Sequence, residues 1–292
     1  MATAACMRSG PTVISPAPRT SSASVDQLVQ LRCSRDGREV VTTWTGDVYA
    51  VVPGTAQRHL FAVVGMNVAR CLRQGERWQL TSRELLYYLD PSTRTRLDRW
   101  TNPWTDRTVA VVHVANERVQ TTFTREVPSV IADGIATIAF DIPVFYPNPL
   151  AADPKTRAFS PFESYQAAEL FTFAAPAAEL EDPTRPSVSR LWFTWHRLGP
   201  WLPWMDMGDR PGQLVYSARG RKVTAFDELP ALLRDEISTR VPLYRHAADC
   251  IVPRPNETSW TYFARHLEMY QAGARFPVPS ALDPAECAAT TN

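Results

Sequence analysis

The segment 191–212 combines a large aromatic surface with charged side chains. Its sequence, LWFTWHRLGPWLPWMDMGDRPG, contains four of the nine tryptophans of the chain and ends in a polar turn with Asp209 and Arg210. A core strand needs the aromatic residues only, whereas a ligand pocket needs both kinds of side chain. Aromatic walls also raise the pKa of a neighbouring carboxylic acid, which suits it for general acid catalysis. We therefore expect a pocket wall here; a tryptophan-rich plug followed by a surface turn is the alternative.

Two neighbouring charges interrupt the strand-like stretch SRELLYYLD. Arg83 and Glu84 are adjacent, so their side chains face opposite sides of a sheet. In a barrel one of them must point inward, where a buried charge needs a partner or a ligand. An internal salt bridge satisfies this need as well as a ligand does. We assign Arg83 to the site, where it would hold a carboxylate or a developing oxyanion, with Tyr87 on the same face orienting the substrate.

Three further stretches contain polar residues of catalytic type, each with a structural alternative. VVHVAN contains His113, the best histidine base of the N-terminal half, although a lone strand histidine is more often structural. WTNPW places Asn102 between two tryptophans, the second being Trp104, in a pattern that equally suits a turn. PNETSW contains Asn256 and Glu257, and the same residues suit the start of a helix.

Together these residues predict a pocket for acid–base chemistry without a cofactor. The catalytic candidates are His113, Asp209, Arg83, Arg210 and Glu257. The substrate-binding candidates are Tyr87, Asn102, Trp104, His196, Trp201, Trp204, Met207 and Asn256. No histidines stand at HxH, HxxxH or HExxH spacing, and no GxSxG, GxGxxG or GxxxxGK[ST] motif occurs. The sequence therefore predicts no metal site and no nucleotide cofactor.

The elements that position these residues are mainly strands. Short stretches rich in Val, Thr, Leu and aromatic residues follow one another up to about residue 146, separated by turns such as RDGRE, TGD and DPSTRT. Their spacing predicts an antiparallel meander that forms a barrel or half-barrel, calycin- or lipocalin-like. Residues 162–182 have helical composition, and amphipathic patterns over 227–241 and 257–271 predict C-terminal helices. The expected fold class is α+β, mainly β.

The expected domain organisation is a single β-barrel-like domain over residues 26–275. The Ser-, Thr- and Pro-rich residues 1–25 predict a disordered tail, and residues 276–292 predict a flexible one.

Composition excludes several classes of partner. The 31 basic and 30 acidic residues give a net charge of +1, without the excess expected of a nucleic-acid-binding protein. No apolar run is long enough for a membrane span. The five cysteines are odd in number and lack CxxC spacing, which favours a reducing, cytoplasmic location with Cys71 and Cys250 as buried thiols. A homodimer is left open.

A series of motifs resembles the domain-of-unknown-function family DUF1838, which occurs in bacteria and fungi. They are, in order, RCSRDGREV, WTGDVYAVVPG, GMNVARC, SRELLYYLDP, RWTNPWT, VVHVAN, PWMDMGDRPGQLVYSARGRK, FDELP and PNETSWTYF. The resemblance extends from about Asp26 to Gln271. It implies a small-molecule protein, since some members are encoded near genes of specialised metabolism. The chain departs from the pattern at Glu117, which stands where relatives carry an aspartate.

We expect an enzyme that acts on a hydrophobic, polyketide- or terpenoid-like molecule in specialised metabolism. Cyclisation, isomerisation and dehydration all suit carboxylate, histidine, tyrosine and arginine side chains. The alternative is a non-catalytic, lipocalin-like carrier of the same ligand, which needs a fitting pocket but no titrating group. A third reading is a scaffold that offers its tryptophan-rich face to a protein partner.

Overall fold

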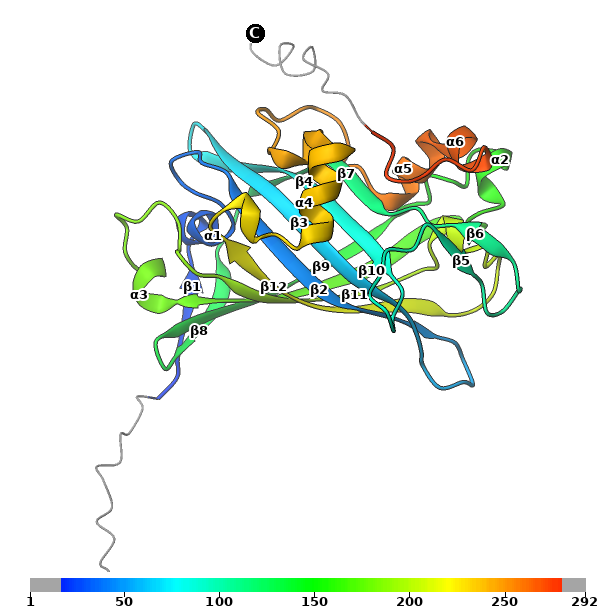
Figure 1. Ribbon diagram of the computed structural model, residues 1–292. Coiled ribbons are helices and arrows are strands. Elements are labelled where there is room, and N and C mark those ends of the chain that lie inside the picture. The colour runs from blue at the N-terminus through cyan, green and yellow to red at the C-terminus, as the bar shows by residue number, and fades with distance from the viewer. Residues whose placement is uncertain (1–16, 280–292) are drawn as a thin grey trace, which may run out of the picture.

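A computed structural model describes residues 17–279, and its main element is one antiparallel sheet of ten strands (Figure 1). In spatial order the strands run β1-β8-β9-β10-β11-β12-β2-β3-β4-β7. Their bounds are β1 (Arg19–Ala23), β2 (Val40–Val51), β3 (Arg58–Gln74), β4 (Arg77–Leu89), β7 (Val114–Phe123), β8 (Val127–Ala132), β9 (Ile135–Pro147), β10 (Ser164–Pro176), β11 (Trp192–Gly199) and β12 (Gln213–Val223). A separate hairpin pairs β5 (Arg99–Thr101) with β6 (Thr108–Ala110).

Helices are few and short. The α-helices are α1 (Val25–Arg32), α2 (Pro154–Arg157), α3 (Ala177–Leu180), α4 (Ala231–Thr239), α5 (Ser259–Arg265) and α6 (Leu267–Gln271). The 3-10 turns are η1 (Pro203–Met205), η2 (Phe226–Glu228) and η3 (Pro242–Arg245). The sheet curls into a half-barrel, and α4 lies across the outside of β3 and β4 (Figure 1). The mainly β fold with an antiparallel half-barrel and C-terminal helices is confirmed.

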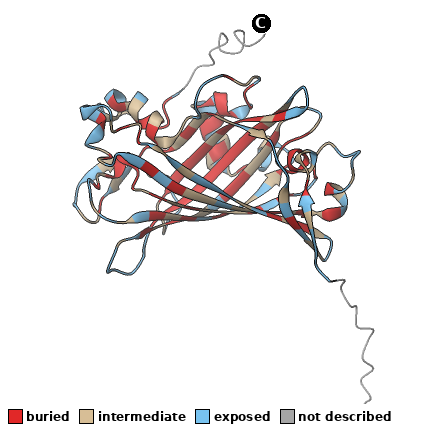
Figure 2. Ribbon diagram, turned by 180° about the vertical axis from the view of Figure 1, so that it is seen from behind, coloured by how far each residue is buried: buried red, intermediate tan, exposed pale blue. Residues whose placement is uncertain are grey.

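Strands β3 and β4 are buried on both faces along most of their length (Figure 2). On β4, the Tyr87 hydroxyl points outward and donates to Glu236 of α4 at 3.4 Å. The next residue, Tyr88, points inward, and its hydroxyl lies 3.0 Å from the hydroxyl of Tyr216 on β12. Since β3 and β2 separate β4 from β12 in the sheet, this contact shows how strongly the sheet curls.

The edge strand β7 is covered by the segment that leads into α5. Asn256 accepts a hydrogen bond from the backbone N–H of Gln120 at 2.7 Å and donates to the carbonyl of Gln120 at 2.9 Å. One side chain thereby takes the place of a neighbouring strand residue, which protects an exposed edge. The helix α5 then reaches the opposite wall, where the Trp260 ring contacts Tyr165 of β10 at 4.6 Å between centroids.

Expectations about local structure are wrong in three regions. The stretch 162–182, expected to be a helix, contains strand β10, because β9 and β11 pair with it on both sides and override its Ala- and Glu-rich composition. Part of the expected N-terminal tail is also ordered: β1 pairs with β8, and Ser24 caps α1 with a capping box. In the expected C-terminal tail, Phe276 is buried. The remainder of both tails, 1–16 and 280–292, lies outside the described residues.

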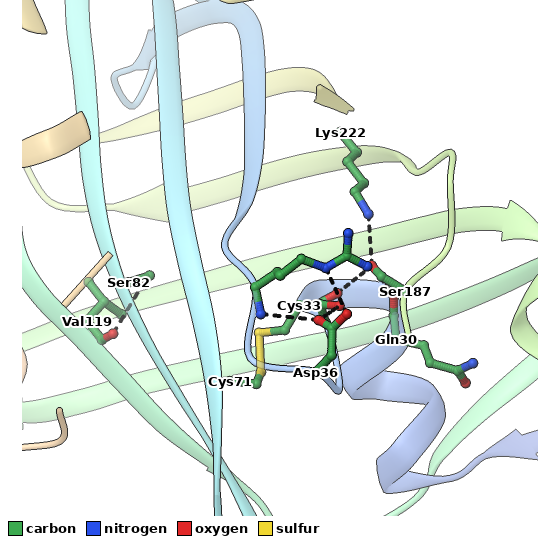
Figure 3. Close-up of a disulfide and its surroundings, with 10 residues drawn as sticks. Gln30, Cys33, Asp36, Cys71, Ser82, Val119, Ser187 and Lys222 are labelled. Atoms are coloured by element: carbon green, nitrogen blue, oxygen red, sulfur yellow. Dashed lines mark hydrogen bonds and ion pairs between the residues drawn. A yellow bond between two sulfur atoms is a disulfide. The ribbon is translucent and has the colours of Figure 1, made fainter. Parts of the chain in front are cut away.

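Cys33, at the end of α1, forms a disulfide with Cys71 of β3 (Figure 3). The two Cα atoms are 5.7 Å apart, and both residues are buried beside Val29, Trp78 and Leu80. The expectation of a buried thiol is therefore wrong at Cys71, and it is also wrong at Cys250, which is likewise disulfide-bonded. The sequence separation of 38 residues hides the pair, because α1 reaches β3 only through the tertiary fold. The prediction of a reducing compartment assumed free thiols, and the Cys33–Cys71 bond removes that assumption.

Across residues 17–279, the chain forms no helix of the length and apolar character that a membrane crossing requires.

Replacing both Cys33 and Cys71 by serine should lower the free energy of unfolding by about 2–4 kcal/mol, because the bond restricts the unfolded chain. Urea unfolding of the variant and the wild type, both without reductant, measures this difference. The variant is more informative than added reductant, which acts on every disulfide of the chain. Equal midpoints and slopes for the two proteins would contradict a stabilising role for this bond.

Candidate functional site

Glu84 points to the concave face of the half-barrel, between two amide side chains. Its register partners are Asn67 on β3 and Asn116 on β7. Asn67 Nδ2 donates to Glu84 Oε1 at 3.4 Å, and Asn116 Nδ2 donates to Oε2 at 3.1 Å. Since all three residues lie on adjacent strands, the sheet itself fixes the position of the carboxyl group. Glu84 is half-buried.

The environment of Glu84 favours its protonated form. Burial raises the pKa of Glu84 above its ordinary value of 4.5, and the negative charge of Glu169 on β10 raises it further. The two amides and Arg32, the last residue of α1, oppose this shift. Four strands separate β4 from β10 in the sheet, so only the curl brings Glu169 within electrostatic reach. A carboxyl group with a raised pKa suits general acid catalysis.

Arg32 and Arg197 supply positive charge to the same face. The Arg32 guanidinium lies 5.0 Å from the centre of the Phe173 ring. Burial lowers the pKa of Arg32, which Glu84 counteracts. Arg197 donates to the hydroxyl of Tyr165, and its Nε lies 3.8 Å from a Glu169 oxygen. Although burial alone lowers the pKa of Arg197, Tyr165 and its other neighbours raise it overall, so this residue remains charged.

Aromatic side chains form the floor beside these charges. Trp44 on β2 lies 6.3 Å from Trp195 on β11 between ring centroids, and 6.2 Å from Phe193. Two glycines make room for these rings. A Cβ at Gly65 would lie 2.4 Å from the Trp44 ring, and one at Gly220 would lie 2.1 Å from Phe193. Trp44 meets both Trp195 and Phe193 edge to face, at 68° and 65°, so these rings form a packed aromatic cluster on the concave face.

The tryptophan-rich segment closes one end of the half-barrel. Asn102 is fully buried; its Nδ2 donates to the carbonyl of Met205 at 2.7 Å and contacts the Met207 sulfur at 3.2 Å. Its Oδ1 accepts from the backbone N–H of Trp104 at 2.8 Å, within the loop of the β5–β6 hairpin. Together with the bond to Met205, this side chain joins the hairpin to η1. Trp204 packs against Tyr88 at 5.5 Å. This arrangement corresponds to the plug that the sequence left open as the alternative.

The charged and polar candidates of the same segment lie apart from Glu84. Asp209 is exposed in the turn after η1, and Arg210 is half-buried. The carbonyl of Arg210 accepts a hydrogen bond from Trp201 Nε1 at 2.9 Å, which secures the turn to the plug. His196 lies on the convex face, because its strand neighbours Trp195 and Arg197 face the concave one. The structure does not bring these three polar residues together.

His113 and Tyr87 are buried behind the sheet, under α4. His113 Nδ1 accepts a hydrogen bond from the backbone N–H of Tyr88 at 3.1 Å, and the imidazole packs against the Tyr87 ring at 4.8 Å. Burial, followed by the positive charges of Arg96 and Arg275, holds the pKa of His113 well below 6.5. The imidazole is therefore uncharged and enclosed between the sheet and α4, on the face opposite Glu84.

Arg83 and Glu257 belong to a buried ionic network that joins β4 to β7 and α5. Arg83 donates to Glu117 Oε1 from Nε at 3.0 Å and from Nη2 at 2.8 Å, and from Nη1 to the carbonyl of His246 at 2.8 Å. Glu257 accepts from the backbone N–H of Glu117 at 2.8 Å and pairs with Arg265 at 2.6 Å. Burial raises the pKa of Glu257 to about 7, although the hydrogen bond from Glu117 and the charge of Arg265 both lower it.

Comparison with known protein families identifies a match to this chain. The profile of the family described as "Protein of unknown function (DUF1838)" matches residues 37–267. The chain belongs to the DUF1838 family. The DUF1838 match covers β2 to α5 and so includes Glu84, both of its amide partners and the aromatic floor. A search of curated proteins finds no match.

Sequence reasoning missed most of the concave cluster in this DUF1838 protein. It recognised that Arg83 or Glu84 must point inward but assigned Arg83 to the site; the outward Arg83 finds its partner in Glu117. Both faces of this strand are equally apolar, with Leu85 and Tyr87 beside Arg83 and Leu86 and Tyr88 beside Glu84, so the sequence does not show which charge points inward. For Arg32 and Glu169 no local pattern exists, because they come within electrostatic reach of Glu84 only in the folded chain. Arg197 joins them as the register partner of Glu169.

The ionic network under α5 should make stability depend on pH. Glu257 has a pKa near 4.5 when unfolded and about 7 when folded, so the folded state binds more protons between these values. The stabilising contribution of the protonated group is therefore lost as the pH rises through this window. In Glu257→Gln this loss should be absent, and the free energy of unfolding should change less with pH than in the wild type.

Urea unfolding at several pH values from about 4.5 to 8 tests this expectation. Glu268→Gln, on the exposed side of α6, is the matched control and should follow the wild type. If Glu257→Gln and the wild type lose stability in parallel across the window, another group carries the effect.

Proposed function

We propose that the concave face binds a hydrophobic small molecule and that Glu84 acts on it as a general acid. The expected reactions are cyclisation, isomerisation or dehydration without a cofactor, on a polyketide- or terpenoid-like substrate of specialised metabolism. The observation that carries the proposal is the placement of Glu84, a half-buried carboxyl with a raised pKa, between two amides and beside an aromatic floor.

Proton transfer from Glu84 accounts for all three reactions. The protonated carboxyl donates to an oxygen or a double bond of the ligand, and Arg32 stabilises the carboxylate that remains. The carboxylate then accepts a proton from a neighbouring carbon, which completes an isomerisation or a cyclisation. If the protonated group is a hydroxyl, it departs as water and the same proton removal completes a dehydration. The aromatic floor supports positive charge that develops on the ligand.

Turnover by Glu84→Gln tests the proposal. The amide has the shape of the acid but cannot transfer a proton, so the rate should fall about 100-fold or more while binding persists. The assay combines purified protein with metabolite extract from a source strain that lacks the gene. Mass spectrometry then follows the conversion of a compound to an isomer, or to a product lighter by one water. Glu268→Gln serves again as the exposed control.

The pH dependence provides a second readout. Because the active form of Glu84 is the protonated one, the rate should fall as the pH rises above a pKa that lies higher than 4.5. A wild-type rate in Glu84→Gln would refute the role of this residue. A compound that the wild type binds and releases unchanged would favour the carrier, which uses the same aromatic floor.

A further inference from the structure

We propose that Arg32 binds a carboxylate of the substrate, which makes the substrate a hydrophobic carboxylic acid. In this arrangement the apolar body of the molecule lies on the half-buried phenylalanines of β9 and β10, next to the guanidinium. The inference rests on the proposed function in one respect: it places the ligand on the concave face that carries Glu84.

The first argument is that the guanidinium of Arg32 is free to bind. Within residues 17–279, no group accepts a hydrogen bond from it and no carboxylate forms an ion pair with it. Arg32 is half-buried, and its nitrogens are not enclosed. Arg83 differs in both respects, since it is buried and donates to Glu117 and to a backbone carbonyl. The donors of Arg32 are therefore available to an acceptor from outside the chain.

The second argument is that the charge of Arg32 is not compensated. Arg197 has Glu169 beside it, with 3.8 Å between Nε and a carboxyl oxygen. The carboxyl group that acts on Arg32 is Glu84, whose environment favours the protonated, uncharged form. In this cluster one positive charge therefore remains for a ligand. A single carboxylate matches that charge and the planar fork of a guanidinium.

The third argument is the apolar surface that begins at the guanidinium. Arg32 lies 5.0 Å from the centre of the Phe173 ring, and Phe173 stacks with Phe171 at 5.7 Å between centroids. Phe140 of β9 stacks with both rings. Phe140 and Phe171 are half-buried, and Ile142, on the same face of β9, is 43% exposed. An apolar body can rest on these side chains while its carboxylate meets Arg32.

The fourth argument is that the backbone on both sides of Arg32 is fixed. Cys33 is bonded to Cys71, and Gln30 Nε2 donates to two backbone carbonyls at 2.9 and 2.7 Å. Leu31 is 1% exposed and Cys33 is fully buried. A side chain that starts from a fixed backbone loses less conformational freedom when it binds a ligand.

Two matched probes test the inference. Naphthalene-2-carboxylate carries the charged group, and naphthalene-2-carboxamide has the same ring and nearly the same shape without the charge. Isothermal titration calorimetry at neutral pH compares their affinities for the full chain. The carboxylate should bind about 10-fold more tightly, because a charge-assisted pair with a guanidinium is stronger than a neutral contact. Equal affinities, tighter binding of the carboxamide, or binding of neither probe would overturn the proposal.

Substitution of Arg32 locates the effect. Arg32→Gln should weaken the carboxylate about 10-fold and leave the carboxamide within about 2-fold. Arg190→Gln is the matched control and should follow the wild type, because Arg190 also lies over an aromatic ring, that of Trp192, but away from the concave face. Unchanged carboxylate affinity in Arg32→Gln, or an equal loss in Arg190→Gln, would refute the assignment.

A second variant keeps the test decisive if Arg32→Gln folds poorly. Arg32→Lys retains the charge but not the planar pair of donors, so its preference for the carboxylate should lie between those of the wild type and Arg32→Gln. If Arg32→Lys and Arg32→Gln weaken both probes equally, the side chain supports packing and does not bind the carboxylate.

The result is separable from catalysis by Glu84. Glu84→Gln should keep the preference for the carboxylate, since the proposed anchor belongs to α1. If Glu84→Gln converts substrate as fast as the wild type, the proposed acid is wrong, but the probe affinities still decide the role of Arg32. Conversely, a loss of turnover in Glu84→Gln together with equal probe affinities in the wild type would retain the acid and reject the anchor.

Discussion

Two phenol oxygens, on Tyr88 of β4 and Tyr216 of β12, lie 3.0 Å apart although two strands separate them in the sheet. This contact spans the curl on which the rest of the molecule depends. It brings Glu169 of β10 into the electrostatic environment of Glu84 and places the guanidinium of Arg197 on the same face. In a flat sheet of the same strands Glu169 and Arg197 would still face each other, but four strands and three strands, respectively, would separate them from Glu84, and they would not perturb it.

The elements around the curl close it in different ways. At one end, Asn102 joins the β5–β6 hairpin to the tryptophan-rich turn by hydrogen bonds to backbone groups. Along the edge, Asn256 and Glu257 fasten the start of α5 to β7, and Trp260 continues the cover to Tyr165. Residues that look catalytic by type thus serve here to hold the walls together, and the polar groups that remain available face the concave side.

The sequence predicts the strands well where side chains alternate and turns separate them, as from β2 to β4. It fails at β10, where Ala167, Glu169 and Leu170 suggest a helix until two neighbouring strands are known to pair with them. Within the site it predicts that Arg83 and Glu84 face opposite sides, which is correct, but not which of them faces inward. That choice depends on Glu117 of the neighbouring strand β7, which pairs with Arg83, and on Arg32 of α1, which lies near Glu84. No local pattern in the sequence relates either element to β4.

Arg32 immediately precedes Cys33, whose bond to Cys71 fastens the end of α1 to β3. The disulfide therefore also anchors the backbone from which Arg32 approaches Glu84. Without this bond, α1 would still be held by the capping box of Ser24 and the hydrogen bonds of Gln30, but Arg32 would be less firmly placed. The oxidation state of the Cys33–Cys71 pair is thus coupled to the acidity of Glu84 on β4, because Arg32 lowers the pKa of that carboxyl group.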